Sequence, residues 1–137
     1  MKKIHILVFT VIAFFILLVY LQWGQEVEGC NTSIETFNDG YLEHVSITSN
    51  SICIFDKEDF AKQVIQKITD NSLKDIKLSY DILGYPNGLH ITVYMNNSLY
   101  NNGKSQFEIS YLQNSEYGFQ YNIKDNPEKF TLEIITQ

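Results

Sequence analysis

The sequence predicts an α+β protein with an N-terminal transmembrane helix followed by a small domain. In that domain one amphipathic helix packs on a mostly antiparallel meander sheet of about five strands, preceded by a hairpin. Three observations support this prediction. Residues 4–23 carry no Lys, Arg, Asp or Glu, residues 56–69 have one apolar stripe at helical spacing, and most later segments alternate apolar and polar residues. We divide the chain into 1–23 (cytoplasmic end and transmembrane anchor), 24–40 (stalk or linker) and 41–137 (exported α+β domain).

The first predicted element is a membrane span over residues 4–23. A helix rises about 1.5 Å per residue, so this run crosses the roughly 30 Å of a bilayer's hydrocarbon. Lys2 and Lys3 precede the run, and the next basic residue besides histidine is Lys57. Positive residues favour the cytoplasmic side, so we expect a single-pass protein of the cell membrane with its N-terminus in the cytoplasm and its C-terminal domain extracytoplasmic. Its first partner is then the lipid bilayer, through residues 4–23.

Two alternatives remain open for this segment. Tyr20 and Trp23 near its end favour an uncleaved anchor, because aromatic residues concentrate at membrane interfaces. However, Val27-Glu28-Gly29-Cys30 resembles a lipobox, which would make the protein a lipoprotein acylated at Cys30. A cleaved signal peptide is the other alternative, although no small-x-small site follows the apolar run.

Size and charge restrict the class of the exported part. Removing residues 1–23 from 137 leaves 114, enough for one compact domain. The net charge of −6 becomes −8 without Lys2 and Lys3, and the chain has no arginine. An acidic surface argues against a nucleic-acid partner, because phosphate binding needs basic residues. The many Lys, Asn, Ile and Tyr residues beside the absence of Arg are typical of an AT-rich bacterial genome.

The predicted domain starts with a hairpin of residues 41–48 and 52–55, joined by a turn at 49–51. Asp56 then opens the helix, because its side chain can accept from free backbone N–H groups, and acidic residues follow in the first turn. Four apolar residues at helical spacing form its stripe: Phe60, Val64, Ile65 and Ile68.

Period-two alternation predicts the remaining sheet. The expected strands are 76–82, 89–95, 107–111, 117–123 and 130–134, with turns at 84–88 and 96–103. Short connections favour an antiparallel meander with one packed and one solvated face. The single apolar stripe of the helix is enough to cover only part of the packed face.

The solvated face of this sheet is the candidate interaction surface. If residues 84–88 close a hairpin, Asp81 lies across from His90 and Thr92. An Asp–His pair suits acid–base chemistry, but an open sheet face excludes no water, so we assign no catalytic residue. The predicted interaction face, including two turn tyrosines, consists of Ser79, Asp81, Tyr85, His90, Thr92, Tyr94 and Tyr100.

Cys30 and Cys53 are both predicted to lie outside the membrane, where an exported pair can form a disulfide. Such a bridge would join the stalk to the domain; the alternative is two free thiols. We predict no metal site and no cofactor, since the chain has no CxxC or HxxxH spacing, no calcium loop and no glycine-rich phosphate loop.

These observations lead to an expected function without enzyme activity. The domain is expected to act as a protein-interaction or envelope accessory module that binds another envelope protein or itself, through the solvated face or an unpaired edge strand. The alternative is an exported domain that binds a small molecule or glycan between helix and sheet. A small hydrolase using Asp81 and His90 is the least favoured hypothesis.

Overall fold

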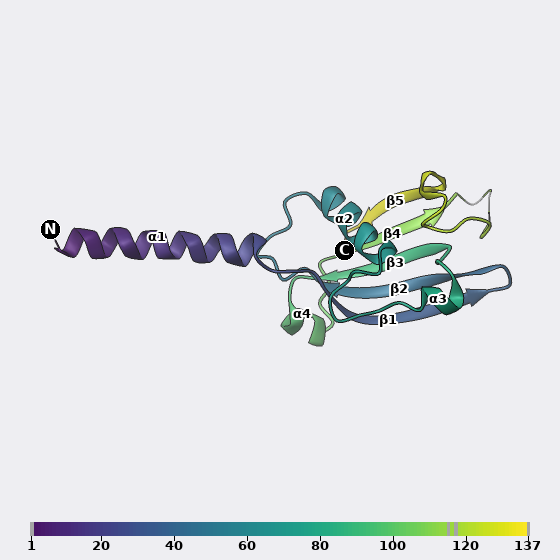
Figure 1. Cartoon of the computed structure of the whole chain (residues 1–137), viewed down its shortest axis with the longest axis horizontal. Coiled ribbons are helices and arrows are strands. Elements are labelled where there is room, and N and C mark those ends of the chain that lie inside the picture. Colours follow the sequence, from purple (N-terminus) through teal and green to yellow (C-terminus); the bar gives the residue numbers. More distant parts are fainter. Residues whose placement is uncertain (1, 115, 117, 137) are drawn as a thin grey trace.

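The computed structural model describes residues 2–114, 116 and 118–136, and it confirms the α+β class (Figure 1). A long helix, α1 (Lys2–Trp23), projects away from one small domain. α1 is long and apolar enough to cross a membrane, and none of its most apolar stretch is buried against the rest of the protein. An N-terminal signal sequence would share these properties.

The domain is built on a sheet whose strands lie side by side in chain order. They are β1 (Glu28–Phe37), β2 (Gly40–Thr48), β3 (Gly88–Tyr94), β4 (Phe107–Gln113) and β5 (Phe130–Ile135). Neighbours are antiparallel except β2 and β3, which are parallel. A parallel pair needs a long crossover, and the chain between β2 and β3 supplies it through α2 (Lys57–Thr69) and α3 (Tyr80–Leu83).

The helix predicted from residue 56 is confirmed as α2. The Asp56 side chain caps it by accepting from the Asp59 N–H at 2.9 Å. Its buried residues, Ala61, Val64 and Ile68, pack on one face of the sheet. The shorter helices are α4 (Asn97–Asn101), between β3 and β4, and η2 (Pro127–Lys129), immediately before β5.

The hydrophobic core lies between α2 and the sheet. Alternate residues of β2, β3 and β4 point toward α2, and the central ones are almost completely buried. These residues are Val45, Ile47, Leu89, Ile91, Val93, Phe107 and Ile109. On the opposite face, the described part of the chain places only the short α4 against the sheet, at the end of β3, and the rest of this face is open (Figure 1).

The predicted stalk and hairpin are corrected by the structure. Residues 28–37, expected in the stalk, form β1 and pair with β2, with a shift of register at Cys30. Residues 52–55, expected as the second hairpin strand, are a loop. The hairpin therefore exists, but its partner strand precedes residues 41–48 in the chain rather than following them.

The predicted strand at 76–82 is also wrong. Asn71 bonds both backbone groups of Leu78, because its Nδ2 donates to the Leu78 carbonyl and its Oδ1 accepts from the Leu78 N–H, each at 2.8 Å. These are the groups that a neighbouring strand would have used. Asp75 adopts a φ of 67°, which interrupts an extended backbone, and residues 80–83 turn into α3.

The predicted strand at 117–123 is a loop wherever the structure describes it; residue 117 itself lies outside the described residues. Side chains, rather than a neighbouring strand, form hydrogen bonds with the backbone of this loop. Asn87 Nδ2 donates to the carbonyls of Phe119 and Tyr121, both at 2.9 Å. Gln113 bonds the N–H and the carbonyl of Tyr121.

Candidate functional site

The predicted interaction face is divided between two sides of the domain. His90, Thr92 and Tyr94 alternate along β3 on the face that α2 leaves open, and Tyr100 of α4 packs edge-on against Tyr94 at 5.2 Å between ring centroids. Asp81 lies in α3 and Ser79 immediately before it. Both are exposed, and neither belongs to the sheet that carries His90, Thr92 and Tyr94.

Tyr85 is half-buried and packs against the hydrophobic core, on the face of the sheet that α2 covers. Its ring is tilted against Tyr80 at 4.5 Å, and its hydroxyl contacts the Lys124 ammonium at 2.7 Å. The seven residues therefore do not form one surface, because the segment 76–85 is not a sheet strand.

The proposed Asp81–His90 pair is wrong for the same reason. Opposite His90 stand His44 on β2 and Ser110 on β4. The rings of His44 and His90 stack at 5.1 Å with an interplanar angle of 18°, and His44 Nε2 lies 3.2 Å from Glu35 Oε2. Among the described residues, no group of three His, Cys, Asp or Glu side chains is placed to hold a metal ion.

The burial of His90 and its contact with His44 shift the pKa of His90. Its pKa lies below the ordinary value because burial disfavours the charged imidazole and because His44 is adjacent, while Glu108 and Glu35 oppose the shift. The open face thus holds an imidazole that stays neutral at pH values where a free histidine becomes charged.

We expect His90 to make the protein less stable as the pH falls below 6.5. An unfolded histidine titrates near 6.5, whereas folded His90 titrates lower. Between these values the unfolded chain binds more protons, so the free energy of unfolding decreases with falling pH. Urea unfolding of the wild type and His90→Gln across this range checks the effect, and the variant should have the weaker pH dependence. Equal slopes would contradict the prediction.

A buried carboxyl group on the other face was not singled out from the sequence. Glu43 is only 3% exposed and accepts a hydrogen bond from the Thr32 hydroxyl. Burial raises its pKa, although Thr32 and His44 act in the opposite direction. The signal was present in the alternation of residues 41–48, which puts Glu43 on the same side as Val45 and Ile47.

A groove of about 470 Å³ lies between α2 and the strands β4 and β5. It exists because α2 covers only part of the packed face, as its single stripe predicted. Tyr111 and Phe130 form part of the floor, with their rings stacked at 5.0 Å, and Leu132 continues it along β5. Ile65 lines the α2 wall.

The groove has a polar rim and an anchored far wall. Lys62, Gln66 and Asp70 line it from α2 and the residue after it. The far wall is the segment between β4 and β5, which contributes Ile123, Lys124 and, at the start of η2, Pro127. The Ile123 N–H donates to the Pro86 carbonyl at 3.0 Å, so this wall is tied to the residues before β3. An apolar floor inside a polar rim is typical of a binding site.

Cys30 and Cys53 are free thiols in the structure, so the disulfide alternative is not formed. Cys30 lies near Thr48, with 4.0 Å between its Sγ and the Thr48 Oγ1, whereas Cys53 is exposed in the loop before α2. Burial raises the pKa of the Cys30 thiol, which makes it less reactive.

Comparisons with protein-family models, with curated proteins and with solved structures found no match to this chain.

Proposed function

We propose that this chain is a single-pass protein of the bacterial cell membrane, with a cytoplasmic N-terminus and an extracytoplasmic, non-enzymatic protein-interaction domain. The length and composition of α1 and the position of Lys2 and Lys3 support the anchoring and the orientation. The observation that carries the interaction proposal is the edge strand β5, which borders the apolar groove and pairs only with β4 among the described residues.

β5 is suited to accept one more strand. Its backbone groups on the side away from β4 have no strand partner among the described residues, and such an edge is a template for an extended peptide. Phe130, Leu132 and Ile134 share the face of the groove, while alternate residues are exposed. A strand added to β5 would place every second side chain over the groove.

The occupant we propose is an extended segment of another envelope protein with alternating apolar and basic residues. Apolar side chains fit the floor of Tyr111, Phe130 and Leu132. On the opposite face, Glu133 is exposed, with Glu108 on the adjacent strand β4. Basic side chains of the added strand would complement these carboxylates and the charge of −8 that remains outside residues 1–23.

A second candidate is the binding of a small molecule or glycan in the same groove. Its volume of about 470 Å³ lies in the usual range for ligand pockets, roughly 300–1,000 Å³, and its stacked aromatic floor suits a sugar or ring. The hydrolase hypothesis is not proposed again, because Asp81 and His90 do not face each other.

In-cell photocrosslinking tests the proposal. A photoreactive residue replaces Thr131, an exposed residue of β5 that does not line the groove, in the full-length chain, and mass spectrometry identifies the captured protein. Ile65→Glu puts a charge into the groove wall, so we expect at least about a tenfold loss of crosslinking, equivalent to about 1.4 kcal/mol. Ile82→Glu is the matched control, because Ile82 is 79% exposed on α3, and crosslinking should persist.

Two results would contradict the proposal. One is a dominant partner that stays crosslinked in Ile65→Glu but is lost when Thr92 and Tyr94 are both changed to Glu, which would assign binding to the open face. The other is a small molecule that copurifies with the wild type but not with Ile65→Glu, without any crosslinked protein, which would favour the second candidate. Thermal unfolding by circular dichroism checks that each variant is folded.

A further inference from the structure

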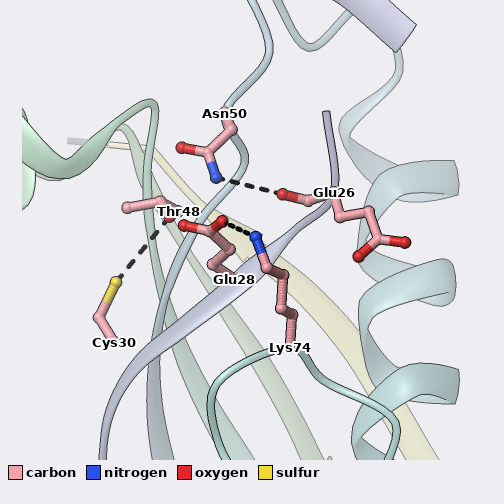
Figure 2. Close-up of polar contacts among 6 residues, drawn as sticks. All are labelled: Glu26, Glu28, Cys30, Thr48, Asn50 and Lys74. Carbon is pink, nitrogen blue, oxygen red and sulfur yellow. Dashed lines mark hydrogen bonds and ion pairs between the residues drawn. The ribbon is translucent and has the colours of Figure 1, made fainter. Parts of the chain in front are cut away.

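The connection between α1 and the domain is short and fastened. Only residues 24–27 separate the last residue of α1 from the first residue of β1. Figure 2 shows how side chains of the domain hold this segment: Asn50 Nδ2 donates to the Glu26 carbonyl at 3.1 Å, and Lys74 pairs with Glu28. The Gly29 N–H also donates to the Lys74 carbonyl at 2.8 Å. The domain therefore follows the helix directly, without the stalk or linker expected over residues 24–40.

A second contact ties the loop before α2 to the end of α1 itself. Gln22 Nε2 donates to the Cys53 carbonyl at 2.7 Å, and the Cys53 N–H donates back to Gln22 Oε1 at 3.1 Å. Gln22 precedes the last residue of α1 by one position. Residues 50–55 are thus held level with the end of the helix, on the side of the domain that faces α1.

This level corresponds to the membrane interface if α1 spans the bilayer. At about 1.5 Å per residue, the 22 residues of α1 are about 33 Å long, slightly more than the roughly 30 Å of hydrocarbon. Trp23 is 71% exposed at its end, where aromatic side chains occupy the headgroup layer.

The loop held at this level exposes apolar side chains. Phe55 is 79% exposed and Ile52 is 54% exposed, although both belong to the folded domain. Two crevices lie between the loop and the end of α1. One, of about 330 Å³, is lined by Trp23 and Phe55, with Asp56 and Asp59 on its polar side. The other, of about 310 Å³, is lined by Leu21 and Ile52 together with polar residues such as Asn50.

We infer that Trp23, Ile52 and Phe55 form a membrane-contacting tip that enters the outer interfacial layer and holds the domain against the bilayer. The occupant of the crevices is phospholipid, because the surface is continuous with the span and lies at its end. Asp56, the N-cap of α2, and the first-turn residues Glu58 and Asp59 lie beside the tip and repel anionic headgroups. The contact is therefore apolar and does not require anionic lipid. This inference rests on the anchoring part of the proposed function and is independent of the groove.

The test uses the full-length chain in phosphatidylcholine vesicles. A nitroxide is attached to Cys53 in a Cys30→Ser variant, and collisions with oxygen, which concentrates in the membrane, are compared with collisions with a water-soluble nickel chelate. The matched control carries the label at Ile82→Cys in a Cys30→Ser, Cys53→Ser background. Ile82 is as exposed as Phe55 but lies on α3, at the end of the domain away from α1 (Figure 1).

We expect the label at Cys53 to favour oxygen and the label at position 82 to favour the nickel chelate. Changing Ile52 and Phe55 together to Ser should shift the Cys53 label toward the nickel-accessible value. Trp23, the sole tryptophan and the last residue of α1, reports through quenching by brominated lipid whether the end of α1 reaches the bilayer, whereas the Cys53 label reports on the loop with Ile52 and Phe55. Equal nickel accessibility at both positions with Trp23 quenched would overturn the tip but retain the anchor. An unquenched Trp23 would overturn both, without bearing on the β5 crosslinking.

Discussion

Phe107→Ala is expected to lower the free energy of unfolding by about 3–5 kcal/mol. Phe107 begins β4 and has no exposed surface. Its ring meets Phe60 of α2 edge-on at 6.2 Å and stands opposite Val93 of β3. Truncation removes this apolar contact and leaves a cavity between helix and sheet that the surrounding elements cannot fill completely. Urea unfolding of the full-length chain in detergent, followed by near-ultraviolet circular dichroism, measures the loss.

Phe55→Ala is the matched control for that loss, because it makes the same chemical change at a side chain that is 79% exposed. Surface changes of this kind usually stay within about 0.5 kcal/mol. A loss at Phe55 as large as that at Phe107 would contradict the assignment of the core. It would also contradict the membrane tip, which requires that Phe55 contribute little to the packing of the domain.

Asn87→Ala is expected to cost about 2–4 kcal/mol and to loosen the far wall of the groove. The Asn87 side chain accepts from the Tyr41 N–H at 3.0 Å and donates to the carbonyls of Phe119 and Tyr121. Each intramolecular hydrogen bond contributes about 0.5–1.5 kcal/mol, and a buried group left without a partner costs more. Unfolding measures the stability, and amide hydrogen exchange over residues 118–126 measures the loosening.

Asn102→Ala provides the comparison for Asn87→Ala. The Asn102 side chain makes one exposed hydrogen bond, to the Ser98 carbonyl at 2.7 Å in α4, so its loss should cost less than about 1 kcal/mol. Unchanged protection of residues 118–126 in Asn87→Ala would mean that Gln113 and the backbone bond between Ile123 and Pro86 are enough to anchor this loop. In that case the groove wall would not depend on the Asn87 side chain.

Most elements with a strong local pattern were predicted correctly. The apolar run of α1, the capped stripe of α2 and the alternation in β2, β3, β4 and β5 all match the structure within a few residues. β1 was missed because residues 31–37 are exposed on both faces, so they show no period-two signal. Its strand character comes from pairing with β2 rather than from its own composition.

The candidate site was predicted less well, since individual side-chain hydrogen bonds, which the apolar–polar alternation does not reveal, decided it. The alternation at 76–82 resembles a strand, but Asn71 occupies the backbone groups of Leu78. With that strand removed, His90 faces His44 instead of Asp81. A turn motif at 84–88 indicates a change of direction, yet it contains no information about the remote loop that Asn87 holds.

The sequence by itself determined the apolar helix that can enter a membrane, the α+β class and the acidic charge of the chain outside residues 1–23. It also determined that the single apolar stripe of the helix covers only part of the packed face of the sheet. These properties depend on composition and short-range periodicity, which tertiary contacts rarely reverse. Only the tertiary structure decided the parallel pairing of β2 with β3, the groove beside β5 and the position of Ile52 and Phe55 at the end of α1. Each depends on contacts between residues far apart in the chain, such as Gln22 with Cys53, and local patterns do not specify which distant groups will meet.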